Sequence, residues 1–347
     1  MAKVIAMFNN KGGVSKTTTT FNLGWVLSER GSRVIMVDAD PQCNLTGMTL
    51  SFSDTTSLNQ FYERNPGRNI KEAISPAFNS EPRPITAVEC FPVEGRDGLF
   101  LVPGHIGLAE EEVSLGIAHQ LSETLQPLKN LPGSLRYLFD KTAEKYDADY
   151  VIVDLSPGLG AINQNIVTTA DYFIVPTTPD IFSLMALDSL SRVIPKWIRW
   201  GRRATELDIL KQAEYPFPEI NIKFLGVITQ NFRLRDGKAT SSFQSYIDKI
   251  DDSVNSTLFP ALEGAGATLP NDAYVESGNS NYKLANISDF NGLIATSQKV
   301  QKPVYTLTQE DTQSTGVVWE RQEESIDRFR KLFEKIADSV QILTNWN

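Results

Sequence analysis

Cysteine and histidine are scarce in this sequence. The two cysteines among 347 residues, Cys43 and Cys90, cannot form a framework of disulfide bridges. The two histidines, His105 and His119, leave little for a histidine-based metal site. The composition therefore excludes a disulfide-rich secreted scaffold and is typical of a protein from a reduced compartment.

Long apolar runs, internal repeats and low-complexity tracts are missing too. No uninterrupted apolar stretch is long enough to cross a bilayer, and the amino terminus shows no charged-then-apolar leader. We expect a cytoplasmic protein that is not exported. Acidic residues outnumber basic ones by 42 to 33, which gives a net charge of −9. We therefore do not expect nucleic acid to bind over a large part of the surface, and any DNA contact should be confined to a local basic patch.

The chain begins with a predicted strand, a glycine-containing loop and a helix. The apolar run 4–8 breaks at Asn9-Asn10, and after the pair Gly12-Gly13 apolar residues recur at helical spacing. A loop at the start of a helix turns backbone N–H groups inward and adds the positive end of the helix dipole, so it can hold a polyphosphate. The predicted cradle consists of Gly12, Gly13, Val14, Ser15, Lys16, Thr17 and Thr18.

Two side chains of this loop carry the expected chemistry. Lys16 should reach the β and γ phosphates, and the Thr17 hydroxyl should bind Mg²⁺. The common pattern G-x-x-x-x-G-K-[ST] is not met literally, because Asn10 and Ser15 stand at its two glycine positions. If the position of Ser15 requires a positive φ, a serine there should be strained.

The stretch 11–17, Lys-Gly-Gly-x-x-Lys-Thr, resembles the deviant Walker A loop of the ParA/MinD family of ATPases. This resemblance implies that Lys11 crosses a dimer interface and touches the nucleotide of the other subunit. The alternative is that Lys11 is a solvated loop lysine and that Gly12-Gly13 form a plain turn. Two later motifs argue against that alternative.

The first of these motifs is a second apolar segment, 34–37, that ends in carboxylates. Asp38 and Asp40 come at the carboxyl end of a predicted buried parallel strand, the edge where α/β sheets bind ligands. Asp40 could orient an attacking water there, and Asp38 could support Mg²⁺ or the loop. A strand end turned by Asp-Pro is the alternative. The run Asp-x-Asp-Pro-Gln resembles the second motif of the same family, which implies that Asp40 is the hydrolytic aspartate.

The second motif is a third strand end. Residues 150–153 are mostly apolar and lead to Asp154, as in a Walker B strand that places its aspartate at Mg²⁺. A buried aspartate is costly unless it is paired or bound to a metal, so this position favours a ligand. Gly158 and Gly160 would let the next loop approach the γ phosphate and change conformation. A strand followed by a turn is the alternative for any single segment, but three in this order are hard to obtain by accident.

Two more strand–helix units are predicted. A strand at 171–178 precedes a helix from 181 to about 193, and a strand at 224–231 ends where adenine would lie. The side chain of Asn231 could bond the base. An Asn-Lys-x-Asp guanine motif is absent from the sequence, which favours ATP over GTP.

A basic segment lies between these units. Residues 195–203 combine four basic residues with two tryptophans, a mixture that can hold nucleic acid through phosphates and stacking. A solvated helix end with buried tryptophans looks the same, and we favour that interpretation. Arg233 and Arg235, just past a strand end, are rival candidates for DNA or partner contact.

The remaining segments carry less chemistry. Residues 51–97 are turn-rich, with a helix predicted at 57–63, and we interpret them as an insertion that forms a surface loop. Helices are predicted at 106–123 and 134–145. Residues 264–301 are polar and turn-rich, and the Lys302-Pro303-Val304 that follows them resembles a late stretch of the ParA/MinD family after a loop that flanks the nucleotide.

An amphipathic carboxyl-terminal helix is predicted at about 320–343, because apolar residues from Ile326 to Leu343 recur at three- and four-residue spacing. MinD proteins use such a helix on membranes. Here the polar face mixes acidic and basic residues, whereas membrane-surface helices lean basic. We therefore expect the helix to pack on the sheet, without stable membrane binding.

The resemblance covers most of the chain, and it implies a single α/β domain over 1–347: a mostly parallel twisted sheet with helices on both faces, as in P-loop ATPases. It also implies ATP and Mg²⁺ as cofactors, an ATP-dependent homodimer, and slow hydrolysis stimulated by a ParB-like or other partner. Non-specific DNA is a further expected partner, which would add nucleoid association. The implied function is to partition or position DNA or other cargo. A regulatory or defence switch and a metabolic ATP-dependent synthetase of the same superfamily are the alternatives.

Overall fold

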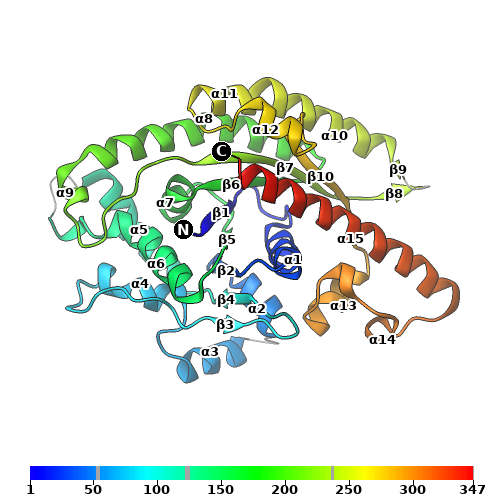
Figure 1. Cartoon of the computed structure of the whole chain (residues 1–347), viewed down its shortest axis with the longest axis horizontal. Coiled ribbons are helices and arrows are strands. Elements are labelled where there is room, and N and C mark those ends of the chain that lie inside the picture. Colours follow the sequence, from blue (N-terminus) through cyan, green and yellow to red (C-terminus); the bar gives the residue numbers. More distant parts are fainter. Residues whose placement is uncertain (52–54, 122–125, 236–237, 347) are drawn as a thin grey trace.

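The computed structural model describes residues 1–51, 55–121, 126–235 and 238–346, and within them one eight-stranded sheet forms the centre of the molecule (Figure 1). The strand order is β10-β7-β6-β1-β5-β2-β4-β3, and neighbouring strands are parallel except β3 and β4. This confirms the expected mostly parallel α/β sheet. The strands are β1 (Lys3–Met7), β2 (Val34–Ala39), β3 (Phe91–Pro92), β4 (Leu99–Val102), β5 (Tyr150–Leu155), β6 (Tyr172–Thr177), β7 (Lys223–Phe232) and β10 (Lys283–Ser288), with a separate short pair, β8 (Leu234–Arg235) and β9 (Lys238–Ala239).

Helices cover both faces of this sheet (Figure 1). The β1–α1–β2 and β5–α7–β6 connections run in opposite directions across it, so right-handed crossovers place α1 and α7 on opposite faces. Helix α15 contacts α1, whereas α5, α6 and α8 contact α7. The helices are α1 (Lys16–Glu29), α2 (Asn44–Leu50), α3 (Thr55–Arg64), α4 (Ile70–Phe78), α5 (Leu108–Leu121), α6 (Leu131–Tyr146), α7 (Ala161–Thr169), α8 (Ile181–Glu206), α9 (Asp208–Lys211), α10 (Ser241–Ser253), α11 (Phe259–Gly264), α12 (Asn271–Glu276), α13 (Leu293–Val300), α14 (Gln309–Thr312) and α15 (Gly316–Thr344), with a π-helical turn at Val254–Leu258 and 3₁₀ turns at Gln126–Leu128 and Val304–Thr306.

The central strand β1 lies between β5 and β6, and its residues from Val4 to Met7 are buried. In the β-sheet register Met7 is opposite Asp154, and Asp154 is opposite Asp38 of β2. The loop after β1 and the two aspartates therefore meet at the carboxyl edge of the sheet, where open parallel sheets bind ligands.

The segment 51–97 is not a surface loop. It carries α3, which contains the predicted helix 57–63, and also α4 and the edge strand β3; residues 52–54 lie outside the described residues. Its apolar side chains join the main core because α4 packs against α6. These core residues are Ile70, Ile74, Ala77, Ile85, Val88, Cys90 and Val93. The interpretation of the segment as an insertion stays a prediction.

Other predicted elements differ from the structure mainly at their ends. Helix α8 continues to Glu206 rather than ending near 193, and Pro195 lies inside it. The predicted helix 106–123 is confirmed over Leu108–Leu121, while its last two residues lie outside the described part. Strand β10 was not predicted, because it has only three apolar residues, Leu284, Ala285 and Ile287, within a polar stretch.

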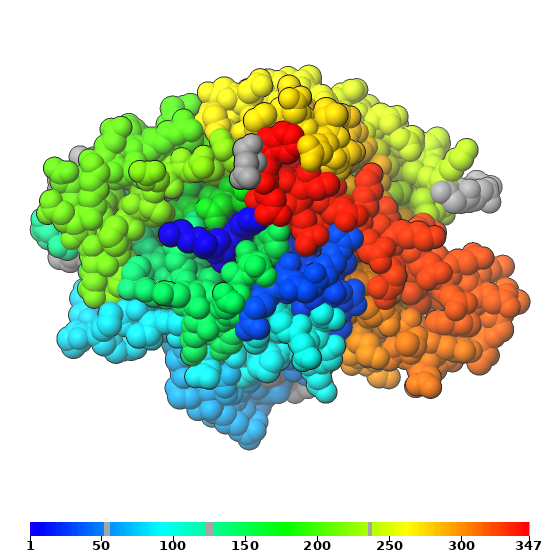
Figure 2. All heavy atoms as spheres, in the orientation of Figure 1, coloured from blue at the N-terminus to red at the C-terminus, as the bar shows by residue number. Residues whose placement is uncertain are grey.

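Helix α15 packs on the sheet as expected. Figure 2 shows its red segment directly against blue residues of the amino-terminal part, and α15 contacts both α1 and β10. Arg30 Nη1 pairs with Asp338 at 2.6 Å, and Tyr150 Oη lies 3.2 Å from Thr344 Oγ1. The apolar stripe of α15 is buried. It consists of Ile326, Phe329, Phe333, Ile336, Val340 and Leu343. In the described ranges, no helix is long and apolar enough to cross a membrane.

His119 of α5 gives this fold a predictable response to acid. Its ring packs on Trp200 with centroids 4.2 Å apart, and its Nε2 lies 3.2 Å from Asn165 Nδ2. Burial lowers the pKa of His119 from 6.5 to about 3. The folded state therefore keeps the ring neutral, while the unfolded chain gains a proton as the pH falls below 6.5, so this contribution to stability is full above pH 6.5 and declines below it.

We expect the free energy of unfolding to fall by about 1 kcal/mol from this group between pH 7 and 5, allowing for solvent screening of a partly exposed ring. Chemical denaturation of wild type and His119→Gln at both pH values isolates the effect, because other titrating groups contribute equally to both proteins. If the two proteins had the same pH dependence, the burial of a neutral His119 would be ruled out as its source.

Candidate active site

The loop between β1 and α1 is tied to the ends of neighbouring strands. Asn9 Nδ2 donates to the Pro176 carbonyl of β6 at 2.7 Å. Gln230 Nε2 of β7 donates to the Val14 carbonyl at 3.1 Å. Because these contacts come from buried strand ends, the loop is held in shape by the sheet itself, as a preorganised binding cradle requires.

Lys16, the first residue of α1, is almost fully buried. Its Nζ donates to the carbonyls of Asn9 and Lys11, at 3.3 and 3.2 Å. Burial lowers the pKa of Lys16, and the charges of Asp154 and Asp40 oppose that shift. The lysine therefore extends along the inside of the loop, where it can meet the phosphates of a bound nucleotide.

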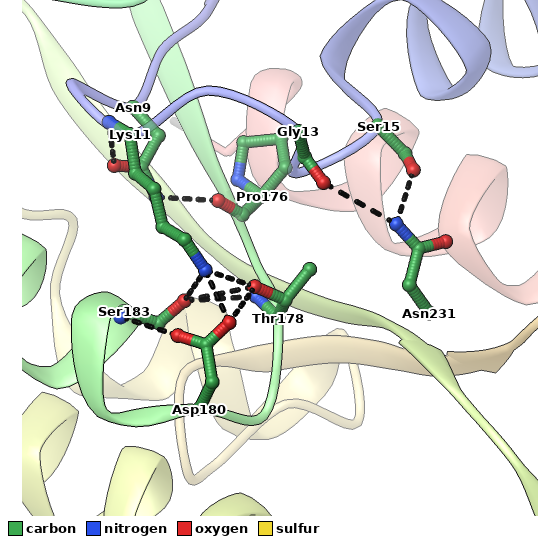
Figure 3. Close-up of polar contacts among 9 residues, drawn as sticks. All are labelled: Asn9, Lys11, Gly13, Ser15, Pro176, Thr178, Asp180, Ser183 and Asn231. Carbon is green, nitrogen blue, oxygen red and sulfur yellow. Dashed lines mark hydrogen bonds and ion pairs between the residues drawn. The ribbon is translucent and has the colours of Figure 1, made fainter.

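Ser15 has a left-handed conformation, so the condition under which strain was expected is met. Its φ is 57° and its ψ 33°, a region that costs an L-residue about 1–2 kcal/mol. The expected strain is therefore confirmed. The hydroxyl of Ser15 accepts a hydrogen bond from Asn231 Nδ2 at 2.7 Å, a contact that glycine could not make (Figure 3). Asn231 thus lies beside the loop, and its contact with adenine stays a prediction.

Lys11 is held within its own chain. Figure 3 shows its Nζ among the side chains of Thr178, Asp180 and Ser183, at the start of α8. Asp180 is also the N-cap of α8, since its other oxygen accepts from the Ser183 N–H at 2.9 Å. Burial would raise the pKa of Asp180, but hydrogen bonds led by the one from Lys11 outweigh it and hold the pKa below its usual range. We call this set of contacts the lysine cage.

Asp154 is the feature that most clearly calls for a ligand. It is 1% exposed, and neither of its carboxylate oxygens has a hydrogen-bond partner in the described structure. Burial, and next the charge of Asp38, raise its pKa well above the usual range, while the nearby Thr17 hydroxyl and then the charge of Lys16 oppose this rise. A metal ion between Asp154 and the Thr17 hydroxyl would satisfy these oxygens, because hard divalent cations bind oxygen ligands. The residues present therefore fit Mg²⁺.

The two aspartates after β2 have different surroundings. Asp38 is fully buried and accepts hydrogen bonds from the Thr46 N–H at 2.8 Å and the Thr46 hydroxyl at 2.6 Å. Burial raises its pKa to about 6 in spite of these bonds. Asp40 is 7% exposed, lines the cavity described next, and accepts from the Gln42 N–H at 3.0 Å. Asp38 thus anchors α2, which leaves its metal contact a prediction, and Asp40 faces the place where a water could be positioned.

A cavity of about 1060 Å³ opens above the loop and is lined by Lys16, Thr17 and Asp40. Several lining residues were not expected, namely Cys43, Met48, Ser51, Leu58, Ile106, Gln298 and Lys299. Helix α13 reaches the cavity from the far edge of the sheet, with Gln301 Nε2 donating to the Thr49 carbonyl at 2.9 Å. The resemblance of Lys302-Pro303-Val304 to a late stretch of the ParA/MinD family implies a flanking loop here, but it does not predict helix α13. Burial raises the pKa of Cys43 to about 12, so its thiol stays protonated.

One protein family matches the part of the chain that contains this site. The family described as AAA domain matches residues 2–206, which is more than half of the chain and includes the loop, Asp40 and Asp154. The chain belongs to this family. The relatives of this AAA domain protein include P-loop ATPases of the ParA type. The resemblance of its motifs to the ParA/MinD family is therefore confirmed.

Two curated relatives and one solved structure illustrate the similarity. The sporulation initiation inhibitor protein Soj of Bacillus subtilis is 30% identical over 56% of this chain and 65% of its own length. The chromosome partitioning protein ParA of Caulobacter vibrioides is 31% identical over 56% of this chain and 62% of its own. The structure of pNOB8 ParA bound to nonspecific DNA has a TM-score of 0.55 at 21% identity, covers all of both chains and supports the fold. The match thus spans less than two thirds of these two curated relatives.

Proposed function

We propose that this AAA domain protein is a ParA-like ATPase that uses ATP-dependent dimerisation and hydrolysis to partition or position DNA or other cargo. The observation that carries the proposal is the buried, unpartnered carboxylate of Asp154 beside the phosphate loop. A carboxylate in that position needs a cation, and the Mg²⁺ of a bound nucleotide supplies one. The names of the relatives, one for chromosome partitioning and one for a complex with nonspecific DNA, favour the proposed cargo.

Each motif has a part in the proposed reaction. The backbone of residues 12–18 holds the phosphates, and Lys16 contacts the β and γ phosphates. Thr17 and Asp154 would hold Mg²⁺, which when bound would neutralise the charge that develops on those phosphates. Asp40 positions the attacking water, and Asp38 keeps the start of α2 in place through its bonds to Thr46. Phosphoryl transfer needs positioning and electrostatic stabilisation more than covalent help, and these groups can supply both.

The proposed dimer face surrounds the lysine cage. Three apolar side chains at the start of α8 are exposed, with Phe182 at 64%, Met185 at 62% and Ile181 at 49%. Large apolar side chains that cluster on a surface mark contact sites, and these follow directly after Asp180. An ATP-bound partner that covers them would also offer Lys11 a new anion, the nucleotide of that partner. Lys11 would then have to leave the lysine cage.

Asp180→Asn should strengthen ATP-dependent dimerisation by about two- to fivefold, because it removes the charge that holds Lys11 while asparagine still caps α8. Analytical ultracentrifugation with a non-hydrolysable ATP analogue and Mg²⁺ measures the change.

Two controls accompany that variant. The melting temperature without nucleotide should change little, since an ion pair that is partly exposed contributes little to stability. In a Lys11→Ala background no ATP-dependent dimer should form, with or without Asp180→Asn, because the proposed dimer contact needs Lys11. Weaker dimerisation of Asp180→Asn would show instead that Asp180 contributes directly to the dimer contact.

The solution mass of wild type with ATP and Mg²⁺ is the first test of the proposed function. A mass that doubles only with ATP supports a dimerising switch. A monomer that binds ATP and turns over a small molecule would replace the proposal with a metabolic ATP-dependent synthetase. A stable ATP dimer that shows no measurable hydrolysis, even with partner proteins or DNA added, would instead favour the regulatory or defence switch.

A further inference from the structure

The segment that joins β5 to α7, residues 156–160, borders the nucleotide cavity. We call it the β5–α7 loop. It begins two residues after Asp154, and its Pro157 is one of the residues that line the cavity. It also touches the phosphate loop, because the Gly158 N–H donates to the Asn10 carbonyl at 3.1 Å. The position of the β5–α7 loop therefore affects the space in which a bound triphosphate and an attacking water would lie.

Asn163, in the first turn of α7, ties this loop to the helix. Its Nδ2 donates to the carbonyl of Ser156 at 3.0 Å and to that of Gly158 at 3.1 Å. Its Oδ1 accepts from the Ser156 hydroxyl at 3.3 Å. Because carbonyls can only accept hydrogen bonds, the amide nitrogen must face them. Asn163 is 2% exposed, so water does not compete for these bonds, and one buried amide fixes the chain on both sides of Pro157.

Helix α7 gives Asn163 a fixed position. The helix contacts α5, α6 and α8, and its Ile162 and Ile166 belong to the main core. Glu112 of α5 accepts a hydrogen bond from the Ile162 N–H at 3.3 Å, and a side chain at Gly160 would collide with the Glu112 carboxylate. Residues that are themselves locked by packing hold a site precisely. We therefore expect the β5–α7 loop to keep the place that Asn163 sets.

A purely structural role for Asn163 is the alternative, since buried carbonyls need hydrogen-bond partners wherever they lie. Asn165, two residues farther along α7, illustrates that role. It is fully buried, and its Nδ2 donates to the Pro132 carbonyl at 2.8 Å. Neither Asn165 nor Pro132 is among the described residues that line the nucleotide cavity. Asn163 differs because both of the carbonyls that it binds belong to the loop beside that cavity.

We infer that Asn163 is a positioning residue for ATP hydrolysis. The inference rests on the proposed function, because it concerns the same reaction. Asn163 acts through the β5–α7 loop, which brings Pro157 to the cavity that Asp40 also lines. A displacement of about 1 Å near the reacting atoms can slow a reaction by about 10²-fold. ATP binding depends instead on the phosphate loop, which Asn9 and Gln230 tie to the sheet without help from Asn163.

Asn163→Ala and Asn165→Ala form a matched pair for the test, because each removes one buried amide from α7. Phosphate release at saturating ATP and Mg²⁺ measures kcat, and isothermal titration calorimetry with a non-hydrolysable analogue measures affinity. We expect Asn163→Ala to lower kcat by about 10- to 100-fold and to change the affinity by less than about threefold. Asn165→Ala should keep kcat within about twofold of wild type, although both variants should melt at a lower temperature because each leaves buried carbonyls unpaired.

Asn163→Asp is a second variant in case Asn163→Ala does not fold. It keeps the shape of the side chain, and the dipole of α7 favours a negative charge in the first turn. The carboxylate cannot donate to the carbonyls of Ser156 and Gly158, so kcat should fall as it does in Asn163→Ala.

Three results for the variants would overturn the inference. These are an unchanged kcat in Asn163→Ala, equal losses of kcat in Asn163→Ala and Asn165→Ala, and a loss of ATP affinity in Asn163→Ala as large as its loss of kcat. The last result would assign Asn163 to the shape of the binding site. Failure of the proposed function would look different, because wild type itself would then bind no ATP or hydrolyse none.

Discussion

Lys16→Ala should lower the affinity for ATP by at least about 100-fold. Lys16 is buried inside the loop, with its Nζ on the carbonyls of Asn9 and Lys11, so its charge is directed at the bound phosphates. Charge-assisted hydrogen bonds contribute about 1.5–3 kcal/mol each, and the loss of two contacts corresponds to this factor or more. Isothermal titration calorimetry with ATP and Mg²⁺ measures the loss.

Lys11→Ala is the matched control for that experiment. Lys11 lies in the same loop, but its ammonium is in the lysine cage rather than in the cradle. The Lys11→Ala variant should bind ATP with nearly wild-type affinity but remain a monomer. If Lys16→Ala bound ATP as well as wild type does, the phosphate-loop assignment would be wrong.

Asp40→Ala should keep ATP binding and lower the hydrolysis rate by about 10²–10⁴-fold, the range expected for loss of a group that positions or activates a water. With ATP and Mg²⁺ present the variant should then accumulate as a dimer, because hydrolysis is what separates the subunits in the proposed cycle. Phosphate release and the solution mass are the two measurements.

Asp40→Asn distinguishes chemistry from structure at this position. The Asp40 carboxylate accepts a hydrogen bond from the Gln42 N–H, and the asparagine oxygen can accept the same bond. Loss of hydrolysis in both variants would assign the effect to the charge of Asp40. Near-normal hydrolysis in Asp40→Asn would mean that the carboxylate is needed only to hold the turn.

The central motifs were predictable from the sequence because their chemistry is local. A buried strand followed by glycines, Lys16 and Thr17 specifies a phosphate loop over a few residues. The ends of β2 and β5 could be placed beside it because parallel strands share one carboxyl edge, and the register of Asp38 with Asp154 bears this out. Even the strain at Ser15 followed from its place in the motif.

What the sequence did not reveal depends on contacts between distant segments. The lysine cage pairs Lys11 with Asp180, and no local sequence pattern predicts that ion pair. Helix α13 reaches the nucleotide cavity only because the chain crosses back from β10 toward α2. In the segment 51–97 the turn-rich stretches concealed α4, although Asn69 and Glu72 form an ordinary helix start. Burial between remote elements, rather than local propensity, decided each of these cases.

The position of β1 determines when, during synthesis of the chain, the phosphate loop can take its final shape. Both strands that flank β1 are made far later in the chain, and the contact of Gln230 with the Val14 carbonyl comes later still. At about 5–20 residues per second, a ribosome needs about 10–40 s to pass from Lys16 to Gln230. During that interval the phosphate loop has been synthesised but lacks the strands that shape it. We therefore expect ATP to bind only chains that extend past Gln230, because shorter products lack the strand contact that helps to shape the loop.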